Sequence, residues 1–137
     1  MAAGSTIPKP LPHPTPLTQP FWDAAKQHRL VLPRRKDGTY FWYPRTLEPG
    51  TLTAGWDWAP ASGRGVVYSF TVDRRGTAPA FAAGAPYVIA IVELAEGPHF
   101  TTNIVGCAPG DVRIGMPVEA VFEDVTAEIA LVKFRPA

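Results

Sequence analysis

Four basic residues form the clearest candidate for chemistry in this sequence. Arg34, Arg35, Lys36 and Arg45 lie close together along the chain. Guanidinium groups match phosphate oxygens in two-point contacts, and the lysine ammonium adds a point charge. These residues are therefore predicted to contact the phosphates of a ligand. The alternative interpretation is a solvated turn, or a surface that forms ion pairs with a partner protein.

The distribution of charge indicates two surfaces of different character. Residues 1–47 hold seven Lys or Arg against two Asp, whereas residues 93–137 hold seven Asp or Glu against three Lys or Arg. A basic front end beside an acidic C-terminal part favours a surface that meets a phosphate-bearing ligand. Chance clustering on a solvated surface explains the pattern equally well.

The sequence contains no set of residues that is typical of a catalytic centre. It lacks a nucleotide-binding glycine motif, a phosphate loop, a serine-hydrolase elbow, a zinc-protease motif and a paired-carboxylate signature. Cys107 is the single cysteine, and His99 is the His nearest to it in the sequence. A buried or half-buried structural role for Cys107 is favoured over a nucleophilic one. No catalytic residue is predicted.

Cysteine content and hydropathy bear on the cellular compartment. A single cysteine excludes an internal disulfide and fits a reducing environment. No run approaches the about 18 apolar residues of a membrane span, and the first residues lack the apolar core of a secretory signal. We expect a cytoplasmic protein that makes no contact with a membrane.

The basic cluster lies in a segment of alternating strands and turns. A strand, a tight turn, an aromatic strand and a turn-rich loop are predicted at Arg29–Leu32, Arg35–Gly38, Tyr40–Tyr43 and Pro44–Gly50. The alternation of Trp56-Asp57-Trp58 predicts a half-buried strand after them. This order of elements resembles that of a zinc ribbon.

The positions at which a zinc ribbon carries its ligands hold other residues here. Such a ribbon has a Cys-x-x-Cys pair in each turn, because tetrahedral zinc takes four donors in two close pairs. The corresponding positions are Arg35 and Gly38 in the first turn, and Glu48 and Thr51 in the second. This set cannot hold zinc, so no metal site is predicted.

An extended arm and one helix are predicted before the ribbon. Prolines at alternate positions from Pro8 to Pro16 predict a polyproline-like arm, which is either docked on another surface or disordered. A short helix is predicted from Thr18 to His28. Thr18 can act as its N-cap, and Pro20 is tolerated in its first turn.

Apolar strands without a long helix between them follow from residue 61. Five are predicted, at residues 65–72, 87–94, 100–105, 117–122 and 128–134, with a short helix or turn at 109–115. Five such strands suit a closed barrel of the OB type, since closure removes exposed edges. The predicted fold class is therefore all-β. Its parts are a proline-rich arm at 1–17, a helix with a degenerate zinc-ribbon-like module at 18–60, and an OB-fold barrel at 61–137.

Several motifs agree in order and spacing with one protein family. They are Pro20-Phe21-Trp22, SGRGVVYSFT at 62–71, PYVIA at 86–90, NIVG at 103–106 and VRIGMPV at 112–118. Over residues 17–136 the chain resembles the OB-fold proteins of domain-of-unknown-function 35, whose members combine a rubredoxin-like zinc ribbon with an OB barrel. It departs from the family pattern at all four cysteine positions.

The resemblance implies a role in acyl-CoA chemistry. The chain would be a non-catalytic accessory subunit of a thiolase-superfamily enzyme, such as a thiolase, an acyltransferase or a lipid-transfer-like aldolase that shortens side chains. A thiolase-fold partner in a hetero-oligomer would carry the catalytic residues. This chain would stabilise that partner and help to frame its coenzyme A site. The coenzyme A thioester would be shared with the partner, and no cofactor would be bound by this chain alone.

Two groups of residues are expected to serve this role. Arg34, Arg35, Lys36 and Arg45 are expected to contact the phosphates of coenzyme A. Exposed aromatic side chains make good interface anchors. Those expected at the partner interface are Phe21, Trp22, Tyr40, Trp42 and Trp56. Aromatic packing is further expected to replace zinc in holding the ribbon together.

Two other classes of function compete with this interpretation. OB barrels commonly bind single-stranded nucleic acid through aromatic platforms in a basic groove. The barrel strands here carry few bases and many acids, which argues against that class. A stand-alone acyl-CoA enzyme needs an acid, base or nucleophile constellation that the sequence does not offer.

Overall fold

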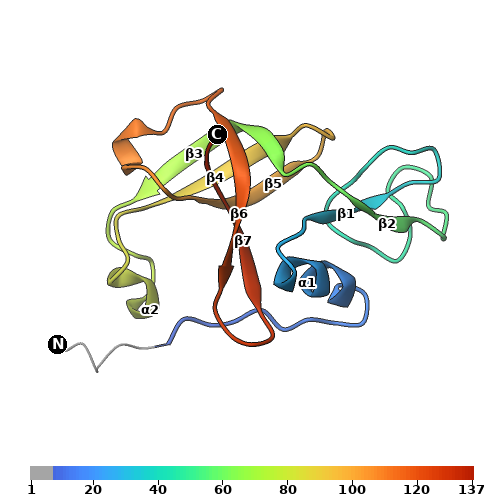
Figure 1. Cartoon of the computed structure of the whole chain (residues 1–137), viewed down its shortest axis with the longest axis horizontal. Helices are drawn as coiled ribbons and strands as arrows, with labels where there is room; N and C mark the ends of the chain where they lie inside the picture. Colours follow the sequence, from blue (N-terminus) through green and yellow to red (C-terminus); the bar gives the residue numbers. More distant parts are fainter. Residues whose placement is uncertain (1–7) are drawn as a thin grey trace.

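A helix and a two-stranded ribbon lie beside a closed β-barrel in the computed structural model, which describes residues 8–137 (Figure 1). The elements are α1 (Gln19–Lys26), β1 (Val31–Arg34), β2 (Asp57–Pro60), β3 (Arg64–Asp73), α2 (Pro79–Ala82), β4 (Tyr87–Leu94), β5 (His99–Ile104), the 3-10 turn η2 (Pro109–Asp111), β6 (Pro117–Asp124) and β7 (Ala130–Pro136). Within the described residues, no helix is both long and apolar enough to cross a membrane.

The barrel closes in the strand order β3-β4-β5-β7-β6. Neighbouring strands are antiparallel except β5 and β7, which meet in parallel at Ile104 and Phe134. Alternate residues of β4 face the core, and the buried ones are Val88, Ala90, Val92 and Leu94. The predicted all-β fold with a five-stranded OB-type barrel is confirmed, and each barrel strand lies within two residues of its predicted bounds.

The ribbon consists of β1 and β2, which pair antiparallel over four residues each. The predicted aromatic strand at Tyr40–Tyr43 is wrong, because a single bridge between Arg34 and Tyr40 is all that links this segment to β1. Next to this bridge, the carbonyl of Tyr40 accepts a hydrogen bond of 3.1 Å from the guanidinium of Arg35, and the pairing with β1 does not continue. Phe41 packs inside the ribbon against Trp56, whereas Trp42 packs toward the barrel.

Helix α1 is shorter than predicted and ends at Lys26. Pro20 lies in the first turn as predicted, where its missing N–H costs no intrahelical hydrogen bond. Thr18 is at the N-cap position, but its hydroxyl lies 3.2 Å from that of Thr15 and does not cap the helix. The buried residues of the helix are Phe21, Ala24 and Ala25.

An aromatic cluster joins the helix and the ribbon to the barrel. The ring centroid of Trp42 lies 5.0 Å from that of Phe21 in α1 and 5.1 Å from that of Phe100 in β5. Phe100 lies 6.0 Å from Phe134 of β7. Phe21 and Leu32 of β1 belong to the same buried cluster as the barrel residues. Helix, ribbon and barrel therefore share one hydrophobic core.

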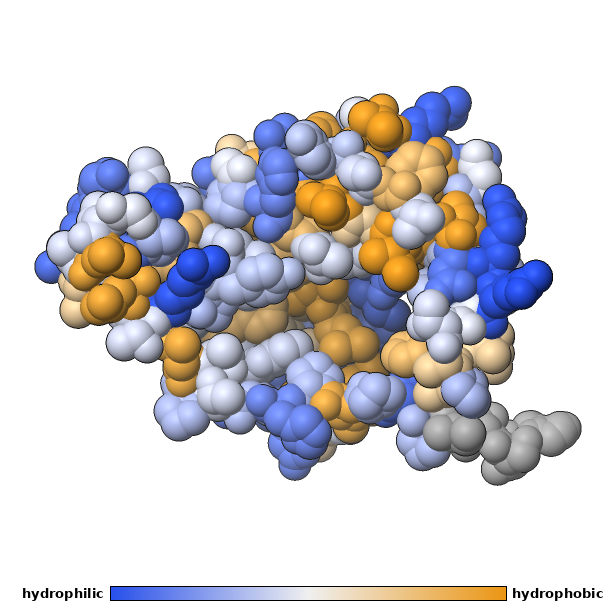
Figure 2. Space-filling model, turned by 180° about the vertical axis from the view of Figure 1, so that it is seen from behind, coloured by the Kyte–Doolittle hydropathy of each residue, from blue (hydrophilic) through white to orange (hydrophobic). Residues whose placement is uncertain are grey.

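The described part of the proline-rich arm, residues 8–17, runs past α2 and the barrel, and most of its residues are exposed. Lys9 Nζ lies 5.7 Å from the ring centroid of Phe81 in α2. Pro10 and Leu11 line a groove of about 660 Å³ together with the ends of β4 and β5. Figure 1 shows the arm running beneath the barrel to α1. The view from behind in Figure 2 shows a hollow with a hydrophobic floor. Residues 1–7 of the predicted arm lie outside the described residues.

Truncation of Phe21 is expected to destabilise the whole chain. Phe21→Ala deletes a buried ring and leaves a cavity, which lowers the free energy of unfolding by about 3 kcal/mol. Urea unfolding followed by tryptophan fluorescence measures this loss. Tyr68→Ala removes a ring that is 52% exposed on the barrel and should change the same quantity by less than about 1 kcal/mol. Equal losses for the two variants would contradict the shared core.

Candidate functional site

The side chain of Glu48 holds the two loops of the ribbon together. The first loop comprises residues 35–39 and the second comprises residues 44–55. Glu48 in the second loop is only 3% exposed. Its Oε1 accepts a hydrogen bond of 2.6 Å from the hydroxyl of Thr51, and its Oε2 accepts one of 3.4 Å from the backbone N–H of Lys36 in the first loop. A carboxylate from one loop thus fixes the backbone of the other.

Arg35 makes the reciprocal connection from the first loop. Its Nε donates to the carbonyl of Pro49 in the second loop at 3.2 Å. Its Nη1 donates to the hydroxyl of Thr39 and to the carbonyl of Tyr40, both at 3.1 Å. The guanidinium also lies 5.2 Å from the ring centroid of Phe41. Nε and Nη1 of Arg35 are therefore engaged inside the ribbon.

The four positions predicted as degenerate zinc ligands are thus accounted for. Arg35, Glu48 and Thr51 form the hydrogen-bonded cross-link, and Gly38 closes the first turn with φ of 92°, where its N–H donates to the carbonyl of Arg35 at 3.0 Å. A guanidinium cannot ligate zinc, and one carboxylate with one hydroxyl is far from a tetrahedral set. Among residues 8–137, no three His, Cys, Asp or Glu side chains are grouped to hold a metal ion. The residues present do not fit zinc.

The carboxyl group of Glu48 titrates below its ordinary range. The hydrogen bond from the Thr51 hydroxyl is the largest cause that lowers the pKa of Glu48, and the Lys36 N–H, the Thr53 hydroxyl and the charge of Arg35 lower it further. Burial acts in the opposite direction, but the hydrogen bonds outweigh it. Glu48 is therefore ionised at neutral pH, which makes it a strong hydrogen-bond acceptor.

Aromatic rings fill the space beside this cross-link. Phe41 is 4% exposed and meets Trp56 edge to face at 5.4 Å between ring centroids. Trp56 meets Trp58 in the same way at 5.3 Å. The indole N–H of Trp56 donates to the carbonyl of Arg45 at 2.6 Å. The ribbon thus combines the predicted aromatic packing with a polar cross-link that was not predicted.

The other predicted phosphate ligands remain at the surface. Arg34 forms an ion pair of 3.6 Å with Asp57. Lys36 and Arg45 are exposed, and both lie next to one short segment of the second loop. A Cβ placed on Gly55 would lie 3.0 Å from Cε of Lys36, and the following Trp56 is bonded to the backbone of Arg45. The structure therefore brings these two cations to one region of the ribbon.

One predicted interface residue is not available at the surface. The expectation that Phe21 is an exposed anchor is wrong, because its ring is 6% exposed within the shared core. Trp22, Trp42 and Trp56 are half-buried, so part of each ring stays accessible. Tyr40 is also half-buried, and its hydroxyl donates to the carbonyl of Pro60 at 2.7 Å.

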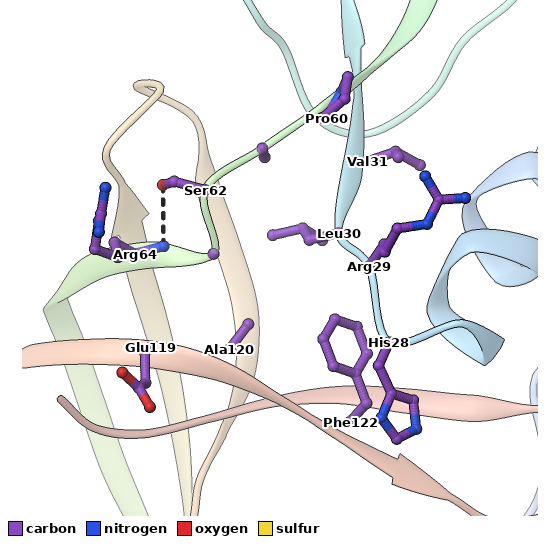
Figure 3. Close-up of a pocket in the computed structure, with 12 residues that line it drawn as sticks. His28, Arg29, Leu30, Val31, Pro60, Ser62, Arg64, Glu119, Ala120 and Phe122 are labelled. Carbon is purple, nitrogen blue, oxygen red and sulfur yellow. Dashed lines mark hydrogen bonds between the residues drawn. The ribbon is translucent and has the colours of Figure 1, made fainter.

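A hollow of about 480 Å³ lies where helix, ribbon and barrel meet. Its walls come from the segments that follow α1 and β2, and from β6. Figure 3 shows Arg29 on the α1 side of the hollow and Arg64 on the opposite side. Glu119 in its wall is paired with Arg135 at 2.8 Å. The two arginines do not converge, so this hollow does not provide an anion site.

The polar cross-link contains residues that the sequence did not single out as functional. Thr39 receives a bond from Arg35, and Thr53 lies 2.9 Å from Thr51 between hydroxyl oxygens. The signal in the sequence was an acidic residue at a ligand position with two threonines following it, Glu48, Thr51 and Thr53. That signal was weak, because a glutamate in a turn is ordinarily solvated.

A family model and a solved structure are similar to this chain. Residues 58–123 match the family model described as the C-terminal OB-fold domain of ChsH2. The chain is similar to a chain of the solved Ltp2-ChsH2(DUF35) aldolase, with 38% identity and a TM-score of 0.81 over 92% of this chain and 98% of that one. The chain belongs to the DUF35 family of OB-fold proteins.

Two curated relatives extend the comparison. A probable enoyl-CoA hydratase alpha subunit of Thermomonospora curvata is 43% identical over 119 residues, which are 85% of this chain and 37% of the relative. A DUF35 domain-containing scaffold protein of Methanocaldococcus jannaschii is 54% identical over 65 residues, which are 47% of this chain and 45% of the relative. The chain therefore spans less than half the length of these curated relatives.

Neutralisation of Glu48 is expected to weaken the ribbon in a pH-dependent way. Because the pKa of Glu48 is lowered in the folded state, its stabilisation is fully present above the ordinary pKa of about 4.3 and is lost as the pH falls through the lower folded pKa. Glu48→Gln should therefore lower the thermal midpoint by several degrees at neutral pH, and the difference from the wild type should shrink in acid. Tryptophan fluorescence melts across this pH range measure it.

The comparison with the wild type isolates this one group. The pKa values of Asp37 and Asp73 are also lowered, by the side-chain hydrogen bond from Thr39 and the backbone hydrogen bond from Gly76 respectively, but both aspartates remain in both proteins. Glu128→Gln, at an exposed position, should leave the midpoint unchanged. A difference between Glu48→Gln and the wild type that stays constant with pH would contradict the ionised cross-link.

Proposed function

We propose that this chain is a non-catalytic accessory subunit of a thiolase-superfamily, lipid-transfer-like acyl-CoA enzyme, such as a thiolase, an acyltransferase or a side-chain-cleaving aldolase. The observation that carries the proposal is the likeness to a chain of the solved Ltp2-ChsH2(DUF35) aldolase, 98% of which this chain covers. The similarity to a probable enoyl-CoA hydratase alpha subunit also supports acyl-CoA chemistry.

Within the described residues, no acid, base and nucleophile side chains lie together as they would in a catalytic site, which supports a non-catalytic role. His28 pairs with Asp124 at 3.0 Å, and His99 pairs with Glu93 at 3.5 Å, all at the surface. Cys107 is a half-buried free cysteine in the segment after β5. General acid–base or nucleophilic catalysis requires such groups within hydrogen-bond reach of one another around a substrate. We therefore assign the reacting groups to a thiolase-fold partner in a hetero-oligomer.

We further propose that the ribbon helps to frame the coenzyme A site of the partner. Lys36 and Arg45 are the cations of the predicted set that remain exposed, and both border the Gly55–Trp56 segment. Arg34 forms an ion pair with Asp57, and Arg35 forms hydrogen bonds within the cross-link. The coenzyme A thioester would be shared with the partner, and this chain alone would bind no cofactor. A cytoplasmic location is in keeping with the single cysteine.

Coexpression tests the accessory role. The chain, tagged and produced together with the thiolase-fold protein encoded nearest to it, should elute from size-exclusion chromatography as one complex. The partner alone should be less soluble and show a lower thermal midpoint, because binding stabilises the folded state by mass action. Separate elution of the two proteins, together with salt-sensitive binding of this chain to a single-stranded oligonucleotide, would instead favour an OB-fold nucleic-acid-binding protein.

The role of the two exposed cations is tested with the reconstituted complex. The double variant Lys36→Ala/Arg45→Ala should raise the KM for an acyl-CoA substrate about tenfold and leave kcat unchanged, because two charge-assisted phosphate contacts are lost. The matched control is Arg74→Ala/Arg75→Ala, which removes two exposed cations from the loop after β3. An unchanged KM in the ribbon variant, or an equal rise in the control, would contradict this assignment.

A further inference from the structure

One leucine in the second loop has a position that the isolated chain does not explain. Leu52 is 73% exposed, which is the largest exposure among the big hydrophobic side chains of the described residues. Its backbone has φ of 57°, in the left-handed region that disfavours any residue with a Cβ and is ordinarily left to glycine. The residue therefore combines an exposed apolar side chain with an unfavourable backbone conformation. Strain of this kind is typical of functional positions.

The conformation of Leu52 is fixed by the cross-link described above. Its N–H donates to the carbonyl of Glu48 at 3.0 Å. The N–H of Glu48 donates to the carbonyl of Thr53 at 2.9 Å, so the backbone is held on both sides of Leu52. The buried carboxylate of Glu48 in turn anchors this loop to the first loop. The leucine is thus presented to solvent by a rigid support.

The surroundings of Leu52 have the composition of a protein-binding surface. Leu47 in the same loop is 42% exposed. Lys36 in the first loop and Arg45 in the second are exposed, and neither forms an ion pair with any residue from 8 to 137. Figure 2 shows hydrophobic atoms gathered at the ribbon end of the molecule, next to strongly hydrophilic residues. The loops of the ribbon thus expose apolar side chains together with cations, a combination that suits an interface.

We propose that Leu52 is the anchor by which the ribbon docks on the catalytic partner subunit, where it enters an apolar pocket with an acidic rim. The inference rests on the proposed function and names the contact that holds the two subunits together. A rigid support reduces the entropy lost when the side chain is immobilised. The strain and the exposure of Leu52 are therefore offset in the complex, where the side chain is covered.

Substitution of Leu52 by glycine separates docking from folding. Leu52→Gly removes the apolar anchor and also relieves the backbone, because glycine populates positive φ freely. The thermal midpoint of the free chain should stay the same or rise. The dissociation constant for the purified thiolase-fold partner, measured by calorimetry or surface plasmon resonance, should increase about tenfold or more. Leu52→Asn, which tolerates the same conformation, should weaken docking similarly.

The matched control is Ile114, which is 70% exposed on the barrel in the segment before β6. Figure 1 shows this segment on the opposite side of the barrel from the ribbon. Ile114→Ser should leave the affinity for the partner unchanged. If the wild-type chain binds the partner and Leu52→Gly binds equally well, the inference is overturned while the accessory role stands. A wild-type chain that binds no thiolase-fold partner overturns the proposed function and this inference with it.

Discussion

The ionised carboxylate of Glu48 is the constraint on which the ribbon depends. A carboxylate that is 3% exposed is strongly destabilising unless hydrogen-bond donors surround it. The Thr51 hydroxyl and the Lys36 N–H supply those donors, and they come from both loops. The Lys36 N–H, 3.4 Å from Oε2, is the donor that ties this charge to the first loop. The free-energy cost of burying an unpaired carboxylate thus favours the loop conformation in which Glu48 keeps its hydrogen-bond donors.

The cross-link connects stability to the proposed docking. The carbonyl of Glu48 accepts the N–H of Leu52, so the residue that joins the loops also sets the direction of the exposed leucine. At the end of the ribbon that faces the barrel, Trp42 packs on Phe100. This contact fixes the position of the ribbon relative to the core of the barrel. Ribbon, helix and barrel are therefore packed on one another and can present a defined surface. Such preorganisation suits a subunit whose role is to bind and position another.

The sequence predicted the barrel well and the ribbon poorly, for physical reasons. The strands of the barrel are apolar runs bounded by turns, and such patterns depend on local residues. The helix α2 has four residues and no periodic signal, so it was not predicted. Tyr40–Tyr43 has the composition of a strand, but it pairs with β1 through a single bridge, and the Tyr40 carbonyl accepts the side chain of Arg35. The burial of Glu48 and of Phe21 depends on contacts with distant segments, which no local pattern reveals.

The central claim is that side-chain hydrogen bonds hold the ribbon where other members of the family are expected to use zinc. The direct test is a thermal melt of the purified chain, followed by tryptophan fluorescence, before and after treatment with a strong chelator, with the metal content measured on the same sample. The account predicts an unchanged midpoint and zinc far below one equivalent. A midpoint that falls on chelation, with close to one equivalent of zinc in the untreated protein, would contradict it.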